Sequence, residues 1–123
     1  MPLATQPQSF LVKKRAGVLA PLFSVYAKNS FGVGDTGDLK ALLDWALKTD
    51  NSIIQLLPLN DMAGIFCPYD ALSGFALEPL YLSLFDLDLP KDKSIKRQIE
   101  ALRKNLKSAA QYVDYGIKDE KLR

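Results

Sequence analysis

Two short apolar runs and a helical repeat dominate the first half of the chain. Residues 16–19 form an apolar run that stops before Pro21, and residues 52–57 form a second run that stops at Pro58. Short apolar runs with such boundaries are typical of buried strands. Between the runs, four apolar residues recur at helical spacing, namely Leu39, Leu42, Leu43 and Ala46. The pattern predicts a strand, a helix and a parallel second strand, which together form a βαβ unit.

The stretches around this unit are expected to be loops. Residues 24–37 are rich in glycine, asparagine and serine, and Asp38 is well placed to cap the helix that follows. Asn51 is expected to break that helix. Residues 60–79 contain two glycines and two prolines and are expected to form a longer loop after the second strand. Long loops in compact domains are usually functional, so this loop is the first place to look for a site.

The second half of the chain is mostly helical in pattern. Residues 80–87 are irregular or form a short strand or helix. After them, Ser94 can cap an amphipathic helix whose apolar face carries Ile95, Ile99, Leu102 and Leu106. A last helical stretch is expected around residues 108–115 or beyond. Residues 1–14, with two prolines among polar neighbours, are interpreted as a loose lead-in.

Length and composition exclude several classes of protein. With 123 residues, the chain is too short for a complete (β/α)8 barrel of about 250 residues. A net charge of +2 is too small to imply a polyanionic partner. No apolar run reaches the roughly 18 residues that span a membrane, and the N-terminus lacks the charge order of a secretory signal. The single cysteine, Cys67, fits a reducing cytosol, so we expect a cytoplasmic protein without membrane or nucleic-acid partners.

Several kinds of chemistry are disfavoured by the sequence. The chain contains no histidine, which removes Ser/His and Cys/His pairs and most zinc sites, and we predict no metal and no cofactor. Gly32, Gly34 and Gly37 miss the G-x-G-x-x-G spacing of a dinucleotide-binding loop by one place, and we interpret them as turn glycines with positive φ. The basic helix within residues 91–107 lacks interleaved aromatic residues, so its charges are interpreted as a solvated face.

The loop at 60–79 holds the candidate chemistry. A thiol at Cys67 has no histidine to help it form a thiolate. The acids of the loop and its exit are too irregularly spaced to assign a catalytic pair: Asp61, Asp70 and Glu78. Tyr69 follows the second strand, where the loops of a (β/α)8 barrel build the active site, and an aromatic ring packs well against a sugar. From its position alone, Tyr69 is either a sugar-stacking residue or a tyrosine that packs in the core or within the loop.

Several segments, in order along most of the chain, match the motifs of one enzyme family. Residues 15–19 (RAGVL) match a first barrel strand, 31–39 a loop and first helix, and 54–61 (IQLLPLND) a second strand and its exit. The Pro-Tyr and Ser-x-Phe-Ala motifs within 68–76, and the Val-Asp-Tyr motif at 113–115, follow in the expected order. Together they resemble the 4-α-glucanotransferases, called amylomaltases or disproportionating enzymes, of glycoside hydrolase family 77.

The resemblance implies a fold and a reaction. Residues 15–123 would be the N-terminal part of a catalytic TIM barrel, with strands one and two, a substrate loop at 60–79, a helical segment at 94–123 and the barrel incomplete in this chain. These enzymes cut an α-1,4-glucan and pass the released segment to a 4-hydroxyl acceptor with retention, through a glycosyl-enzyme. The family's nucleophilic Asp, acid/base Glu and supporting Asp lie on later strands, so this chain would hold no catalytic residue and be inactive alone.

The resemblance also assigns three substrate-binding candidates, for which the partner would be a maltooligosaccharide or α-glucan. Tyr69 matches the tyrosine that stacks on the sugar beside the cleaved bond. Cys67 stands where compact amylomaltases often have a sugar-contacting serine, and a thiol is a weaker hydrogen-bond partner. Ser73 belongs to the matched Ser-x-Phe-Ala segment. Glu78 replaces an asparagine found in many relatives, and its role stays open at this point.

Two alternatives remain open from the sequence. The chain could be a non-enzymatic βαβ module that binds glucan or another protein, with its apolar surface covered by self-association or by the remainder of the barrel. A basic nucleic-acid binder rests only on residues 91–107. Because two barrel strands leave an open parallel sheet, we also expect the isolated chain to be marginally stable.

Overall fold

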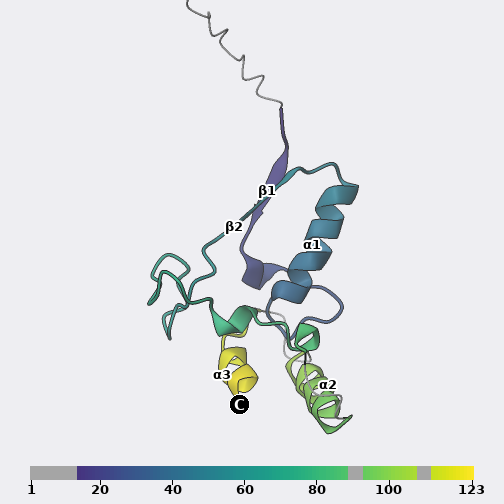
Figure 1. The fold of residues 1–123 in the computed structure, drawn as a ribbon, viewed down its shortest axis with the longest axis vertical. Helices are drawn as coiled ribbons and strands as arrows, with labels where there is room; N and C mark the ends of the chain where they lie inside the picture. Colours follow the sequence, from purple (N-terminus) through teal and green to yellow (C-terminus); the bar gives the residue numbers. More distant parts are fainter. Residues whose placement is uncertain (1–13, 89–92, 108–111) are drawn as a thin grey trace, which may run out of the picture.

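A two-stranded parallel sheet with one helix beside it forms one end of the molecule. The computed structural model describes residues 14–88, 93–107 and 112–123. Strand β1 (Gly17–Ala20) pairs in parallel with β2 (Ile53–Leu56), and helix α1 (Thr36–Lys48) connects the two (Figure 1). The predicted order of strand, helix and parallel strand is therefore confirmed. Apart from Lys14, the predicted lead-in at 1–14 lies outside the described residues.

Helix α1 begins two residues before the predicted cap. Asp35 is the N-cap, and its carboxylate accepts hydrogen bonds from the N–H groups of Gly37 (2.8 Å) and Asp38 (3.3 Å). The Asp38 carboxylate accepts one in return from the Asp35 N–H at 3.1 Å, which completes a capping box. The prediction that Asp38 caps the helix is wrong, because Asp35 has the extended backbone that an N-cap requires. The helix ends at Lys48, three residues before Asn51.

The strands are less buried than the apolar runs predict. Along both strands exposed residues alternate with half-buried ones, and Leu19 and Ile53 are among the exposed large apolar residues. Among the described residues, β1 and β2 pair only with each other, so each has an unpaired outer edge. The prediction of buried strands is wrong for this chain, since burial of a parallel strand needs neighbouring strands and layers on both faces.

The core lies instead beyond the carboxyl ends of the strands. It is built from residues of loops, 3-10 turns and the last helix: Leu22, Phe31, Val33, Met62, Leu80, Tyr81 and Ile117. The short turns are η1 (Leu22–Ser24), η2 (Pro79–Tyr81) and η3 (Leu84–Asp86), so the region expected to be irregular resolves mainly into 3-10 turns. This core packs at the carboxyl end of the sheet, which is the end at which barrel enzymes place their active sites.

Two further helices lie below the sheet in the view of Figure 1, next to the core. The predicted apolar face of α2 (Lys93–Lys107) is confirmed for Ile99, Leu102 and Leu106, which pack against the core. The fourth predicted residue, Ile95, is half-buried. Ser94 lies inside the first turn of α2, so its predicted role as the cap is wrong. The last helix, α3, spans Ile117–Leu122. It lies just beyond residues 108–115, within the range that the prediction allowed, and residues 108–111 lie outside the described part.

The basic residues of α2 are mostly solvated, as expected. Lys93, Lys96, Arg97 and Lys104 are exposed. Arg103 differs, because its guanidinium lies 5.8 Å from the centre of the Phe85 ring and donates hydrogen bonds to the Lys28 carbonyl and the Glu100 carboxylate. Arg103 therefore holds α2 against the core. Nothing in this arrangement favours the nucleic-acid alternative.

The glycines of the 24–37 loop have two different roles. Gly32 has a φ of 83°, as predicted for a turn glycine. Gly34 has no positive φ, and a Cβ built on it would lie 1.9 Å from the Leu22 carbonyl oxygen. The prediction of positive φ is therefore wrong for Gly34, whose lack of a side chain is needed for space. It is also wrong for Gly37, which lies in the first turn of α1.

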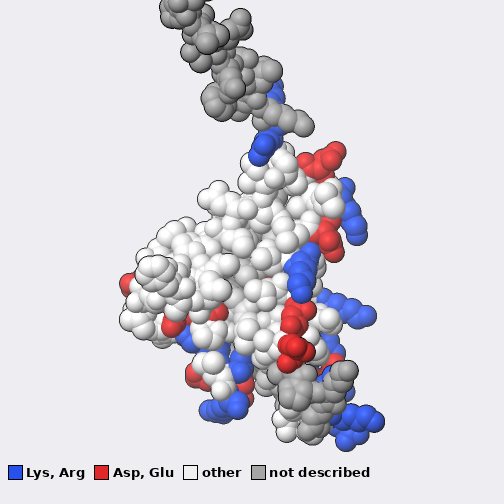
Figure 2. Space-filling view, in the orientation of Figure 1, with Lys and Arg blue, Asp and Glu red and all other residues white. Residues whose placement is uncertain are grey.

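Charged and apolar residues occupy different parts of the surface. Figure 2 shows lysine, arginine and acidic side chains along the outer side of α1 and around α2 and α3, while the face formed by the sheet and the projecting loop is nearly uncharged. Many of the exposed apolar side chains come from the first strand, α1, the start of β2 and the loop: Leu19, Leu43, Trp45, Leu47, Ile53, Ile65, Leu72, Phe75 and Leu77. Further exposed apolar side chains lie later in the chain: Leu82, Phe85, Leu87 and Leu122. An apolar surface of this kind is typical of a face that another element covers.

Candidate functional site

The loop at 60–79 is an ordered projection from the carboxyl end of β2. Its neck is closed by an antiparallel bridge between Asn60 and Leu77. The Asp61 N–H donates to the Ala76 carbonyl at 3.0 Å, and the Leu72 N–H donates to the Asp61 carbonyl at 2.8 Å. These bonds give the loop a defined shape, which Figure 1 shows to one side of the sheet. The predicted loop is therefore confirmed, and it stands where a site on a parallel sheet is expected.

The three predicted substrate-binding residues lie in this loop but have different surroundings. Tyr69 is 75% exposed, so the alternative of a tyrosine that packs within the loop is wrong. Cys67 is a half-buried free thiol, and its carbonyl accepts the Asp70 N–H at 3.0 Å in a tight turn. The Ser73 hydroxyl oxygen accepts hydrogen bonds from the N–H groups of Phe75 (3.2 Å) and Ala76 (3.0 Å). Ser73 therefore shapes the loop, and its hydroxyl proton stays available to a ligand.

Glu78 has a structural role that the sequence left open. Its carboxylate is fully buried and accepts hydrogen bonds from the N–H groups of Met62 (2.9 Å) and Leu80 (3.2 Å). The Lys118 ammonium lies 2.9 Å from Glu78 Oε1 and 3.1 Å from Oε2. A carboxylate that is shielded from solvent and whose oxygens are bound by these partners cannot reach a substrate, which makes it unsuitable as a general acid.

Asp61 shares the same lysine. Its Oδ1 accepts the Ala63 N–H at 3.0 Å and lies 3.1 Å from Lys118 Nζ. The hydrogen bond from the Ala63 N–H, together with Lys118, lowers the pKa of Asp61 below its ordinary value. Although burial acts against the charged form of Lys118, its two carboxylate partners raise its pKa overall. Lys118 is 40 residues away from Glu78 in the chain. No local sequence pattern could have identified this cluster.

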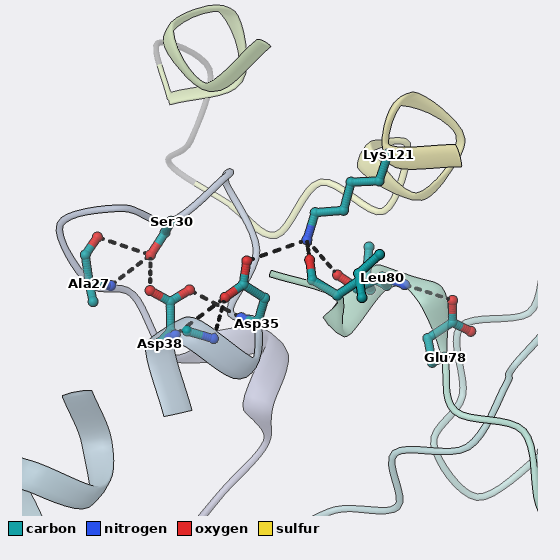
Figure 3. A network of polar contacts seen from close by, with 9 residues as sticks. Ala27, Ser30, Asp35, Asp38, Glu78, Leu80 and Lys121 are labelled. Carbon is teal, nitrogen blue, oxygen red and sulfur yellow. Dashed lines mark hydrogen bonds and ion pairs between the residues drawn. The ribbon is translucent and has the colours of Figure 1, made fainter. Parts of the chain in front are cut away.

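A second buried polar cluster joins the start of α1 to α3 (Figure 3). Lys121 Nζ lies 3.5 Å from Asp35 Oδ2 and donates hydrogen bonds to the carbonyls of Leu80 (2.7 Å) and Leu82 (2.8 Å). Burial raises the pKa of Asp35 despite the nearby ammonium, and burial lowers the pKa of Lys121. Asp38, bound to the Ser30 hydroxyl at 2.7 Å, extends the cluster into the 24–37 loop. All these groups have protein partners, so the cluster stabilises the fold and offers no free catalytic group.

A cavity of about 390 Å³ lies beside this second cluster. It is lined by residues from three segments, including Lys28, Asp38, Lys40, Ser83 and Asp86. The Lys40 ammonium and the Asp86 carboxylate form an ion pair of 2.9 Å there. None of the three predicted substrate-binding residues lines this cavity, so it is separate from the candidate site.

Tyr81 makes a pH-dependent contribution to the stability of the fold, and this contribution can be measured. Burial raises the pKa of Tyr81 to about 12 from an ordinary 10.0, with smaller contributions from Tyr115 and Glu78. The folded state therefore keeps its proton at pH values where the unfolded state ionises, and stability is lost as the pH rises from 10 toward 12. In urea titrations between pH 9 and 12, Tyr81→Phe should lose less stability than wild type. The exposed Tyr112→Phe should follow wild type, and equal slopes for all three proteins would contradict the assignment.

The described residues contain no cluster of histidine, cysteine or acidic side chains arranged to hold a metal ion. Within the same residues, no helix combines the length and the apolar character needed to cross a bilayer. Both statements concern only the part of the chain that the structure describes.

Comparison with known proteins identifies the family. The sequence model of glycoside hydrolase family 77, described as 4-alpha-glucanotransferase, matches residues 20–122. The 4-alpha-glucanotransferase of Chlamydia pneumoniae is 49% identical over 71 residues, which cover 58% of this chain and 14% of that protein. The 4-alpha-glucanotransferase DPE2 of Oryza sativa subsp. japonica is 42% identical over 96 residues, covering 74% of this chain and 10% of that protein.

A third relative extends the same picture. The 4-alpha-glucanotransferase of Chlamydia trachomatis is 37% identical over 90 residues, which cover 70% of this chain and 17% of that protein. The chain thus spans 10–17% of the length of these curated relatives. Because the family model covers most of the chain and the relatives agree with it, this chain belongs to the 4-alpha-glucanotransferase family, glycoside hydrolase family 77.

Proposed function

We propose that this chain is the N-terminal segment of the catalytic (β/α)8 barrel of a 4-alpha-glucanotransferase, with β1 and β2 as its first two strands. The observation that carries the proposal is the parallel pairing of β1 with β2. The family model matches residues 20–122, so the match begins at the last residue of β1 and contains the whole of β2. The exposed apolar residues of the sheet and α1 support it, because the remaining strands and helices of a barrel would cover them. The cytosolic location expected from the lone cysteine is part of the proposal.

The reaction proposed for the complete barrel is transfer of a 1,4-alpha-glucan segment with retention. Two carboxyl groups about 5–5.5 Å apart perform such chemistry, one as nucleophile and one as acid and base. In this chain Asp61 and Glu78 are both bound to Lys118, which leaves neither free for these roles. The proposal therefore places both catalytic acids on later strands of the barrel and predicts that the 123-residue chain alone is inactive.

Glucan binding is the part of the function that we assign to the loop at 60–79. The exposed Tyr69 ring would stack on one glucose unit, while Cys67 and Ser73 would contact its hydroxyl groups. Loss of an aromatic contact of this kind costs about 1.4 kcal/mol, which corresponds to roughly a tenfold weaker affinity. Titration calorimetry with maltoheptaose should therefore show about tenfold weaker binding by Tyr69→Ala. Tyr112→Ala, at another exposed tyrosine, is the matched control and should bind like wild type.

The inactivity of the chain has its own test. The purified chain is incubated with maltotriose, and glucose release is measured. No glucose above a buffer control is expected, because the transfer step needs the carboxyl groups of the later strands. Sustained glucose release that survives repeated purification would overturn the proposal.

A non-enzymatic module is the second candidate. It is favoured by the nearly uncharged face in Figure 2 and by the exposed apolar side chains of the strands, α1 and the loop. A stable module would cover this face by self-association. Sedimentation velocity would then give a dimer at micromolar concentration, and Leu47→Lys on the exposed side of α1 would return it to a monomer. A monomer at all concentrations would remove this candidate.

A further inference from the structure

We propose that the segment 113–121 positions the glucan-binding loop, and that Tyr115 and Lys118 are positioning residues of the sugar site. The inference rests on the proposed function, because it concerns the loop that carries Tyr69. Two residues of this segment contact the loop at two separate points. Neither contact is with Cys67, Tyr69 or Ser73 themselves, so the effect on sugar binding would be indirect.

The first contact is an aromatic pair. The Phe66 ring stacks on the Tyr115 ring, with the ring centres 4.6 Å apart and the planes at 22°. Tyr115 is held from another direction by Phe23, whose ring meets it edge-on at 6.1 Å. Phe66 directly precedes Cys67 and lies three residues before Tyr69. The stack therefore fixes the backbone at the start of the turn that presents the tyrosine.

The second contact is a set of polar bonds from one ammonium group. Lys118 Nζ donates a hydrogen bond to the Ala63 carbonyl at 3.1 Å and binds Asp61 and Glu78. Asp61 in turn accepts the Ala63 N–H, and Glu78 accepts the Met62 N–H. Residues 61–63 are thus bonded to Lys118 either directly or through one carboxylate. This ties the first part of the loop to α3.

The backbone of the loop needs such support. Ala63 and Phe66 have φ values of 51° and 54°, in the left-handed region that residues with a side chain rarely adopt. Non-glycine residues in this region persist where the surroundings hold them. Ala63 is held by Lys118, and Phe66 is held by Tyr115. The same short segment, 113–121, therefore contacts both loop residues that have an unfavourable backbone conformation.

The segment has its own anchors, which separates positioning from folding. Ile117 is a buried core residue, and Lys121 bonds the carbonyls of Leu80 and Leu82. The neck of the loop is closed independently by the bridge between Asn60 and Leu77. Changes at Tyr115 or Lys118 should therefore loosen the part of the loop that carries Tyr69, while α3 stays attached to the core.

The test uses the complete 123-residue chain and hydrogen exchange of its backbone amides. Tyr115→Leu removes the stack, and Tyr115→Phe keeps it. Two loop amides report on the change: the Ile65 N–H is bonded to the Met62 carbonyl, and the Asp70 N–H is bonded to the Cys67 carbonyl. In Tyr115→Leu, both amides should exchange at least tenfold faster than in wild type. The amides within α1 should keep their wild-type rates, and Tyr115→Phe should match wild type throughout. Unchanged exchange in the loop, or equal acceleration in the loop and α1, would overturn the proposal.

A second pair of variants keeps the test decisive if Tyr115→Leu fails to fold. Lys118→Gln removes the charge and is made together with Glu78→Gln, so that no buried carboxylate is left without its cation. Lys118→Arg retains the charge. The expected result is faster amide exchange around Ala63 in Lys118→Gln and wild-type exchange rates in Lys118→Arg. The absence of any local change in Lys118→Gln would count against Lys118.

The sugar site supplies the final readout. Maltoheptaose affinity should fall about fivefold in Tyr115→Leu and stay at the wild-type value in Tyr115→Phe and in the exposed control Tyr112→Leu. Wild-type affinity in Tyr115→Leu, despite a loosened loop, would overturn the positioning role. If the wild-type chain binds no maltoheptaose, the proposed function of the loop fails, while the exchange rates still decide whether the segment orders the loop.

Discussion

With Lys121 replaced by methionine, most of the protein molecules are expected to be unfolded at 25 °C. The Lys121 side chain is fully buried, and its ammonium binds the Asp35 carboxylate and two backbone carbonyls. Methionine has a similar length but cannot donate hydrogen bonds, so a buried carboxylate would lose its cation and the carbonyls would lose a donor. Breaking a buried ion pair from one side costs about 3–5 kcal/mol. A cost of that size is comparable with the whole stability of a marginal domain.

The measurement is a urea titration followed by circular dichroism at 222 nm. Lys40→Met is the matched control, because Lys40 is 65% exposed in its ion pair with Asp86 and should lose about 1 kcal/mol at most. The double variant Lys121→Met, Asp35→Asn should recover part of the loss, since it leaves no buried charge unpaired. Equal midpoints for the Lys121 and Lys40 variants would mean that Lys121 is not buried beside Asp35 in solution.

The parts of the fold that were predictable from the sequence depend on neighbours in the chain. The helical spacing of Leu39, Leu42 and Ala46 identifies α1, and two apolar runs identify β1 and β2. The apolar repeat of α2 was likewise visible. The N-cap is ambiguous in the sequence because Asp35 and Asp38 stand three residues apart, and both take part in one capping box. Only the backbone conformation decides which of them is the cap.

Features that depend on distant residues are not predictable from the local sequence pattern. Asp35 and Lys121 are separated by most of the chain, and nothing in the local pattern of either residue indicates the pair. The exposure of β1 and β2 was missed for a related reason, since an apolar run shows that a strand can be buried but not what covers it. The short helix α3 has no long periodic pattern, and its place is set by Ile117 in the core.

The candidate site was predictable only in part. The long loop and its position after β2 followed from the sequence, and the family resemblance selected Tyr69. The role of Glu78 required the structure, because its partners are Lys118 and two backbone N–H groups. The stack of Phe66 on Tyr115 was also invisible, since aromatic residues in separate segments carry no sign of their contact. In this chain the residues expected to touch sugar are local in sequence, and the residues that support them are distant.

Introducing a single methyl group at Gly34 should have an effect nearly as large as that of Lys121→Met. A Cβ on Gly34 would lie 1.9 Å from the Leu22 carbonyl oxygen and 2.4 Å from the Val25 carbonyl oxygen. Both neighbours are backbone atoms, one in the η1 turn and one in the residue that directly follows it, and they cannot rotate away as a side chain can. The Gly34 N–H also donates to the Phe23 carbonyl at 3.1 Å, so the two segments are bonded at this point. We expect Gly34→Ala to cost about 3 kcal/mol, at the upper end of typical overpacking costs.

Relief of this clash would displace groups on both sides of Gly34. Leu22 is a fully buried core residue on one side, and Asp35, the N-cap of α1, follows Gly34 directly. A urea titration should therefore show a lower midpoint for Gly34→Ala, with weaker helical dichroism in the absence of urea. Gly74→Ala is the matched control, because a Cβ there meets nothing within 4 Å and its φ is not positive. It should stay within about 0.5 kcal/mol of wild type. If the two variants are equally stable, the η1 turn does not pack against Gly34 in solution, and the start of α1 is positioned by other contacts.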